Sequence, residues 1–306
     1  MSGVLEYTRV SRWYGPVIAL NDVSTSIAPG VTGLLGPNGA GKSTFLKLAA
    51  GQIAPSQGAV QLLGRAAWGS PEVFHRVGVC PEADAFWDHL TGLQFVTSLL
   101  RLTGFDEAEC LRRAEQALHT VDLLDAKDRK IGGYSKGMRQ RTKLAQALAH
   151  DPEVLLLDEP LTGMDPLNRR RVVDLVKRLG KEGKTVIVSS HILHEVESMT
   201  HRVMLIHNGR ILAEGEVREI RDLMDEHPHT VSLRARDPRA LARAFVTAPH
   251  VLSVSFGADG EWVTLQTARP DEFYGALREA AVEAGVSEMY SPDEDLESVF
   301  RYLVAR

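Results

Sequence analysis

Residues 36–44 read Gly36-Pro37-Asn38-Gly39-Ala40-Gly41-Lys42-Ser43-Thr44, a glycine-rich loop of the kind that cradles phosphates. Gly36, Gly39 and Gly41 can adopt positive φ, which turns successive backbone N–H groups inward around an anion. In this pattern Lys42 reaches the β- and γ-phosphates, and the Ser43 hydroxyl ligates Mg²⁺. The alternative is a flexible glycine turn. The loop predicts a nucleoside triphosphate site formed by Asn38, Gly39, Ala40, Gly41, Lys42, Ser43 and Thr44.

The residues on either side of this loop have the pattern of a strand and a helix. Residues 31–35 are apolar and short, as is typical of a buried parallel strand, and residues 45–50 continue as a helix. The N-terminal end of that helix directs its dipole at the phosphates. This context favours the phosphate loop over the glycine turn and predicts an α/β fold of the P-loop NTPase class.

Length and composition limit the remaining possibilities. A chain of 306 residues is long enough for two domains. With 44% hydrophobic residues and a formal net charge of -5, it has no excess of positive charge that would favour nucleic acid as a partner. Cys80 and Cys110 form no CxxC pair, which fits a reducing cytoplasm. We expect a protein that is neither secreted nor membrane-spanning on its own, since no leader pattern and no run of about 18 apolar residues occurs.

The spacing of apolar residues changes once before residue 150, from the period of a strand to that of a helix. Residues 5–10 and 20–27 alternate between apolar and polar, which predicts an antiparallel β layer. Between residues 91 and 125, apolar side chains such as Leu111 and Leu118 recur at helical spacing, and Asp106 with Glu109 resembles a capping box. We expect an inserted helical subdomain at about 88–150.

The next segment alternates strands and helices. Residues 154–158 and 185–190 read as buried strands with a helix at 169–179 between them, which implies a parallel sheet with right-handed crossovers. Residues 203–206 and 210–213 read as a hairpin that closes a nucleotide-binding domain over 1–215.

Residues 216–306 are expected to form a small α+β accessory domain. After a charged helix at 216–226, strands and helices follow in a βαββαβ order that is ferredoxin-like, and a helix from Asp295 to Val304 ends the chain. No cluster of catalytic residue types occurs there, so packing or dimer contacts are the expected role.

Two carboxylates follow the apolar run at 154–157. Asp158 then lies at the carboxyl end of a buried strand, where it can hold Mg²⁺ through water, and Glu159 comes next. A carboxylate beside the γ-phosphate can orient and polarise the attacking water, so Glu159 is the predicted general base. The alternative is an exposed acidic turn before Pro160.

Residues 134–141, Tyr134-Ser135-Lys136-Gly137-Met138-Arg139-Gln140-Arg141, resemble the signature motif of ATP-binding-cassette (ABC) ATPases. The resemblance covers about residues 3–220, and the other family motifs occur in the family's order. They are the aromatic Tyr14, the phosphate loop, a switch loop at Pro81-Glu82, the Asp158-Glu159 pair, a dimer loop at Met164-Asp165-Pro166 and the switch histidine His191.

This resemblance implies a homodimer with ATP and Mg²⁺ at its interface. Each ATP would lie between the phosphate loop of one copy and the signature of the other, where Ser135 donates its hydroxyl and Gly137 its backbone N–H to the γ-phosphate. Tyr14 would stack on the adenine and His191 would contact the γ-phosphate. Hydrolysis removes the phosphate that both halves share, and the dimer then opens.

The resemblance has one departure that bears on the chemistry. The family's switch-loop residue is glutamine, and Glu82 stands in that place. Together with Ser43 and Asp158 it would hold Mg²⁺, but its negative charge near a polyphosphate predicts slower turnover or a tighter dependence on Mg²⁺. The catalytic residues implied are then Glu159, His191 and Lys42.

Three further patterns leave alternatives open. His191, His194 and Glu195 share a helical turn, but their spacing matches no common zinc site. Phe86 and Trp87 are either exposed contacts for a membrane subunit or core aromatics. Basic residues on the signature helix are expected to form a solvated face and not a nucleic-acid surface; they are Arg139, Arg141 and Lys143.

The resemblance favours the ATP-hydrolysing subunit of an exporter, on the cytoplasmic face of the membrane with a separate permease. The signature variant, residues 90–92 and residues 296–300 resemble the drug- and lipid-exporter type. Two other functions compete. One is a soluble cassette ATPase that acts on ribosomes or DNA, and the other is a regulatory subunit that binds ATP without hydrolysing it, which the intact Glu159 disfavours.

Overall fold

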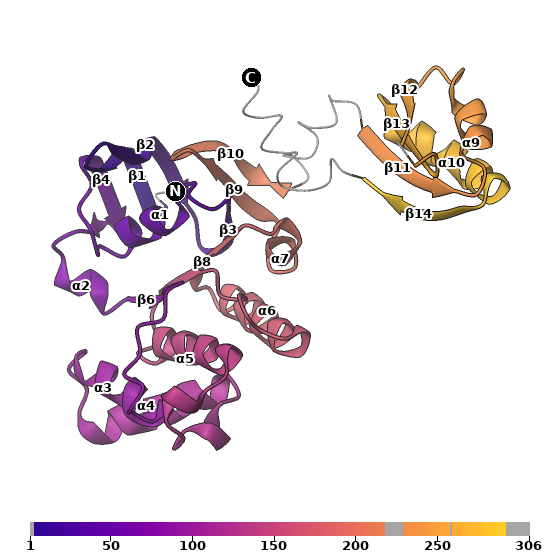
Figure 1. Ribbon diagram of the computed structural model, residues 1–306. Helices are drawn as coiled ribbons and strands as arrows, with labels where there is room; N and C mark the ends of the chain where they lie inside the picture. The colour runs from indigo at the N-terminus through magenta and orange to yellow at the C-terminus, as the bar shows by residue number, and fades with distance from the viewer. Residues whose placement is uncertain (1–2, 218–228, 258, 292–306) are drawn as a thin grey trace. The chain divides into compact units, whose positions relative to one another are not determined.

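The structure is a computed structural model, which describes residues 3–217, 229–257 and 259–291. The chain divides into two compact units, residues 1–216 and residues 217–306 (Figure 1). Most of the helix expected at 216–226 and the whole helix expected at 295–304 lie outside the described residues. Within those residues, no helix is both long and apolar enough to cross a membrane.

A six-stranded sheet forms the centre of the first unit, with the strand order β10-β9-β3-β8-β7-β6. Neighbouring strands pair in parallel except for β9 and β10, which form the antiparallel hairpin expected from the sequence. The strands are β3 (Gly30–Leu35), β6 (Val77–Cys80), β7 (Val154–Asp158), β8 (Thr185–Ser190), β9 (Arg202–His207) and β10 (Arg210–Glu216).

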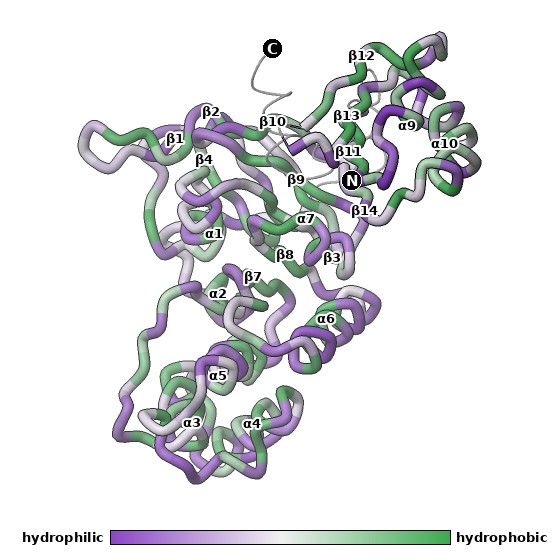
Figure 2. The backbone as a smooth tube through the Cα atoms, turned by 45° about the vertical axis from the view of Figure 1, so that its right-hand side comes forward, coloured by the Kyte–Doolittle hydropathy of each residue, from purple (hydrophilic) through white to green (hydrophobic). Residues whose placement is uncertain are grey.

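The central strands β7 and β8 are buried along their whole length because both faces of the sheet are covered. Figure 2 shows β8 and β9 in green. Along β7, Leu155 and Leu157 belong to the core shared with α5 and α6, whereas Val154 and Leu156 point into the core shared with α1. The covering helices are α1 (Lys42–Ala49), α5 (Lys136–Leu148), α6 (Pro166–Lys181) and α7 (Leu193–Glu197).

A second sheet forms the expected antiparallel layer, in the order β2-β1-β4-β5. Its strands are β1 (Leu5–Tyr14), β2 (Val17–Ile27), β4 (Gln57–Leu62) and β5 (Arg65–Ala66), and a short helix α2 (Pro71–Phe74) follows. The buried Tyr7 ring stacks on Phe45 at 4.3 Å between ring centroids, and its hydroxyl donates to the Phe45 carbonyl at 2.6 Å. This contact fixes the layer to the helix that follows the phosphate loop.

The helical subdomain contains α3 (Gly92–Arg101), α4 (Glu107–Thr120), α5 and two 3₁₀ turns, η1 (Leu124–Ala126) and η2 (Ile131–Gly133). Asp106 caps α4 by accepting from the Glu109 N–H, and a full capping box starts α3, where Thr91 and Gln94 bond each other. Of the apolar residues at helical spacing in this segment, Leu118 is buried, whereas Leu111 is exposed and its neighbour Cys110 is buried.

The second unit has the expected order of elements, which are β11 (His229–Ala235), α9 (Pro238–Phe245), β12 (Val251–Phe256), β13 (Trp262–Thr267), α10 (Pro270–Ala284) and β14 (Val286–Tyr290). The sheet is antiparallel in the order β12-β13-β11-β14. Its core is separate from those of the first unit and centres on Phe245 and Phe273, whose ring centroids lie 5.0 Å apart.

Candidate functional site

The phosphate loop joins β3 to α1. It contains glycines at positions where any other residue would be strained. Gly39 has φ 80° and Gly41, the N-cap of α1, has φ 111°. Gly36 does not have the positive φ that its sequence context allowed. Instead it permits close packing, because a Cβ at this position would lie 2.3 Å from the Ile206 carbonyl oxygen. The loop is further held by the β9–β10 turn, where the Gly209 N–H donates to the Ala40 carbonyl at 2.9 Å.

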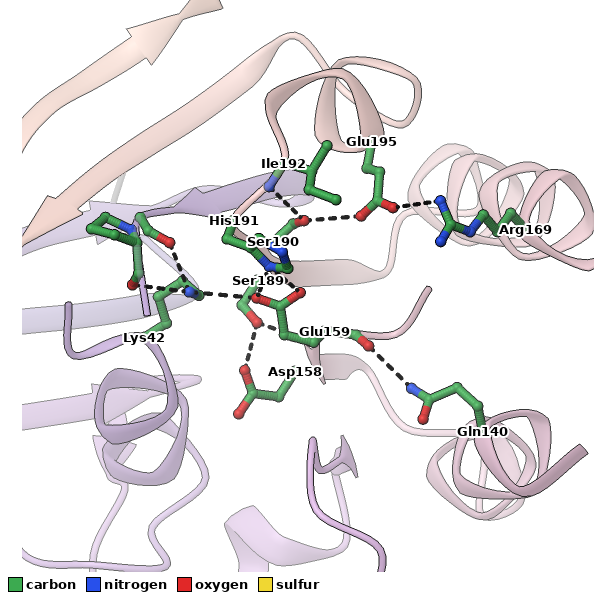
Figure 3. A network of polar contacts seen from close by, with 12 residues as sticks. Lys42, Gln140, Asp158, Glu159, Arg169, Ser189, Ser190, His191, Ile192 and Glu195 are labelled. Carbon is green, nitrogen blue, oxygen red and sulfur yellow. Dashed lines mark hydrogen bonds and ion pairs between the residues drawn. The ribbon is translucent and has the colours of Figure 1, made fainter. Parts of the chain in front are cut away.

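Lys42, the first residue of α1, is only 5% exposed. Its Nζ donates to the Gly36 carbonyl at 2.7 Å and to the Pro37 carbonyl at 3.3 Å. The same Nζ lies 3.4 Å from Glu159 Oε1. The loop cation and the predicted general base therefore form one buried pair (Figure 3).

Glu159 has a left-handed backbone, with φ 47°. A residue other than glycine keeps such a conformation only where its surroundings hold it. The Ser189 hydroxyl accepts from the Glu159 N–H at 3.0 Å, and Gln140 Nε2 donates to the Glu159 carbonyl at 3.2 Å. His191 Nδ1 lies 3.1 Å from both carboxylate oxygens. The strained backbone aims the carboxylate between Lys42 and His191 (Figure 3).

Three side chains with oxygen atoms line one small cavity beside this group. The cavity has a volume of about 120 Å³ and is lined by Ser43, Glu82 and Asp158 among others. Asp158 Oδ1 accepts from the Ser189 hydroxyl at 2.5 Å, so the same serine holds both acidic residues. Hydroxyl and carboxylate oxygens are the ligands that Mg²⁺ prefers, so the residues fit the ion expected here.

The alternative metal site at His191, His194 and Glu195 has no support. Across residues 3–217, 229–257 and 259–291, no group of three or more His, Cys, Asp or Glu side chains is arranged to hold a metal ion. Glu195 instead accepts from the Ser190 hydroxyl at 3.0 Å and pairs with Arg169 at 3.1 Å.

The remaining predicted residues lie on other elements. Tyr14 ends β1 and is 43% exposed, with the Arg12 guanidinium 4.8 Å from its ring centroid. Ser135 is the N-cap of α5, where its hydroxyl accepts from the Met138 N–H at 3.2 Å. Gly137 lies in the first turn of α5 beside the dimer loop, since a Cβ there would be 3.6 Å from the Gly163 carbonyl.

The prediction that the basic residues of α5 form a solvated face is wrong. Lys143 is buried, with 3% exposure, and Arg141 donates to the carbonyls of Val121 and Asp122 at 3.2 and 2.7 Å. Arg139 pairs with Asp88 at 2.8 Å. These three side chains connect α5 to segments that are distant in sequence, and no local period encodes such contacts.

The sequence did not point to Gln140 and Ser189 as residues that bond to the main chain of Glu159. A signal for Ser189 existed, because β7 and β8 were both predicted as buried parallel strands and Ser189 is the Cα partner of Asp158 in their register. Of the aromatic pair, Phe86 packs against the core, and Trp87 is half exposed, with its ring centroid 5.9 Å from that of Phe95.

Known proteins resemble this chain in sequence and in fold. Residues 20–162 match the ABC transporter family. The uncharacterized ABC transporter ATP-binding protein YxlF of Bacillus subtilis is 38% identical over 204 residues, which are 66% of this chain and 67% of that protein. The daunorubicin/doxorubicin resistance ATP-binding protein DrrA of Streptomyces peucetius is 31% identical over 279 residues, 90% of this chain and 84% of that protein.

Among solved structures, the dimeric structure of the bacterial ABC transporter cassette MJ0796 is similar with a TM-score of 0.66 and 24% identity, over 70% of this chain and 99% of that one. This likeness shows the fold, and the sequence relatives show the family. The chain belongs to the ABC transporter family as an ATP-binding protein.

Proposed function

We propose that this chain hydrolyses ATP at the site around Glu159 and thereby drives a membrane transporter. The observation that carries the proposal is the strained Glu159 backbone, which holds the carboxylate 3.4 Å from Lys42 and 3.1 Å from His191. Such strain persists where surrounding contacts maintain it for a function.

In this proposal each residue has one task. Glu159 orients the attacking water and accepts its proton, Lys42 contacts the β- and γ-phosphates, and His191 contacts the γ-phosphate. Ser43, Asp158 and Glu82 would hold Mg²⁺, which when bound offsets the negative charge of the phosphates. The replacement of a glutamine by Glu82 is expected to slow turnover or tighten the dependence on Mg²⁺, and Glu82→Gln tests this expectation.

The working form is a head-to-tail homodimer. Ser135 and Gly137 at the start of α5 would receive the γ-phosphate bound by the phosphate loop of a second copy, and Tyr14 would stack on the adenine. The N-terminus of a 13-residue helix favours an anion at this position. The likeness of the fold to a cassette solved as a dimer supports this arrangement.

The transporter would be an exporter whose permease is a separate chain, with this protein on the cytoplasmic face of the membrane. Support comes from the signature variant at 134–141 and from the similarity to DrrA, whose name describes drug resistance. Residues 216–306 form an accessory domain in this proposal, with dimer contact or packing as its role.

Glu159→Gln tests the proposed catalysis directly. The amide keeps the shape of the side chain but cannot accept the proton, so we expect ATPase activity to fall roughly 100- to 10,000-fold. Because ATP is then not consumed, a dimer trapped by ATP should appear in gel filtration. Retention of wild-type activity in this variant would contradict the role of Glu159.

Co-purification from membranes tests the biological role. An integral membrane protein recovered with the chain supports the transporter, whereas recovery with ribosomes or DNA would favour a cassette ATPase of the other class. ATP binding without any hydrolysis by the wild-type chain would favour a regulatory subunit.

A further inference from the structure

One face of α5, the helix that starts in the signature motif, contacts the segment that contains Glu82, the switch-loop position. Side chains at positions 139, 143 and 146 of α5 lie at helical spacing and all contact residues 79–88. The contacts are Gln146 Nε2 to the Val79 carbonyl at 3.3 Å, Lys143 Nζ to the Glu82 carbonyl at 2.6 Å and Arg139 Nη2 to Asp88 Oδ1 at 2.8 Å.

Lys143 is the central member of this row and the most buried of the three. Its side chain, in a residue only 3% exposed, places the ammonium group 3.0 Å from Asp84 Oδ1 in addition to the Glu82 carbonyl. A buried ammonium is tolerated only when it is paired and hydrogen-bonded. Both partners of Lys143 come from the loop after β6, so the position of this loop and the burial of the charge depend on each other.

The positive charge of Lys143 also lies near the cavity, because its Nζ is bonded to the carbonyl of Glu82, one of the residues that line the cavity. Glu82 and Asp158 line the same cavity and repel each other as carboxylates. A cation fixed under the loop offsets this repulsion.

We propose that Lys143 is a positioning residue of the ATPase site, which fixes the main chain at Glu82 so that the Glu82 carboxylate stays on the cavity lined by Ser43 and Asp158. The inference rests on the proposed function and goes beyond it.

The test compares Lys143→Met with wild type. Methionine fills a similar volume without charge or donor, so Glu82 loses one charge-assisted hydrogen bond. We expect the Mg²⁺ concentration for half-maximal ATPase activity to rise about tenfold or more, with the KM for ATP at saturating Mg²⁺ unchanged. The Mg²⁺ concentration needed for ATP to raise the melting temperature should rise by the same factor.

Three further variants make the result specific. Lys143→Arg keeps a charged donor and should restore most of the wild-type Mg²⁺ dependence. Lys181→Met, the same change on the exposed end of α6, should leave it unchanged. In a Glu82→Ala background, Lys143→Met should cause no further rise. If methionine prevents folding, as judged by circular dichroism, Lys143→Gln replaces it in the same comparison.

Two results would overturn the inference while leaving the proposed function intact. One is an unchanged Mg²⁺ dependence in Lys143→Met, and the other is an equal rise in the wild-type and the Glu82→Ala backgrounds. Absence of both ATPase activity and ATP-dependent stabilisation in the wild-type chain would overturn the proposed function itself, and the inference with it.

Discussion

A single hydroxyl organises the two acidic residues of the site. Ser189 Oγ donates to Asp158 and accepts from the N–H of Glu159, and its side chain is fully buried. The left-handed backbone of Glu159 costs about 1–3 kcal/mol, and the contact from Ser189 is one of those that hold it. The reach of Glu159 toward Lys42 and His191 therefore depends on a residue that need not touch the substrate.

Ser189→Ala removes both hydrogen bonds and leaves the Glu159 N–H and one Asp158 oxygen without this partner. We expect a loss of about 1–3 kcal/mol in the free energy of unfolding, measured by urea titration, and a fall in kcat of at least about tenfold. Ser98→Ala is the matched control, since Ser98 donates to the Gln94 carbonyl in a solvent-exposed hydrogen bond within α3. A kcat equal to wild type would show that Ser189 does not position Glu159.

At the scale of elements, an ion pair links α6 to α7. Its two residues also contact the dimer loop and the residue before His191. Arg169 on α6 donates to the Met164 carbonyl at 3.1 Å and pairs with Glu195 on α7 at 3.1 Å. Glu195 in turn accepts from Ser190, the residue before His191 (Figure 3). Two side chains, Arg169 and Glu195, therefore connect the dimer loop to the end of β8.

Glu195→Ala should weaken the ATP-trapped dimer and leave nucleotide binding by the single chain unchanged. Arg169 is substantially exposed, so solvent partly screens its ion pair with the buried Glu195; the expected effect on the dimer comes from the freed Met164 loop. In a Glu159→Gln background we expect the Kd of the dimer to rise about tenfold, which corresponds to roughly 1.4 kcal/mol, measured by analytical ultracentrifugation. Glu182→Ala, which removes an exposed partner of Arg178, is the control. Equal dimer Kd values for the two variants would contradict the link.

The elements that sequence predicted well are those whose pattern is local. Apolar runs bounded by turn residues predicted 154–158 and 185–190, which are β7 and β8. The face of α5 was predicted wrongly because a lysine in a helix is usually solvated, and its partners here are a carbonyl and a carboxylate from the loop after β6. The strain at Glu159 was not predictable either, because the contacts from Gln140 and Ser189 arise only once three elements are packed.

At the scale of the whole molecule, the two units have separate hydrophobic cores. Among the residues that the structure describes, the core of the second unit draws on positions between 231 and 286, with Phe245 and Phe273 almost fully buried at its centre. The phosphate loop and the Glu159 site belong entirely to the first unit. Each unit is therefore expected to unfold as its own cooperative transition, and only the first should respond to nucleotide.

Phe273→Ala tests this independence. Removing a fully buried ring costs about 3–5 kcal/mol, so the transition of the second unit should move to a lower temperature in calorimetry. MgATP at about 100 times its Kd should stabilise the first unit by about 2.7 kcal/mol, and this shift should be the same in the variant and in wild type. Tyr274→Ala, at a partly exposed neighbouring position, should lower the second transition much less. A single transition that both MgATP and Phe273→Ala move would mean that the two units unfold together, because stabilising one would then stabilise the other.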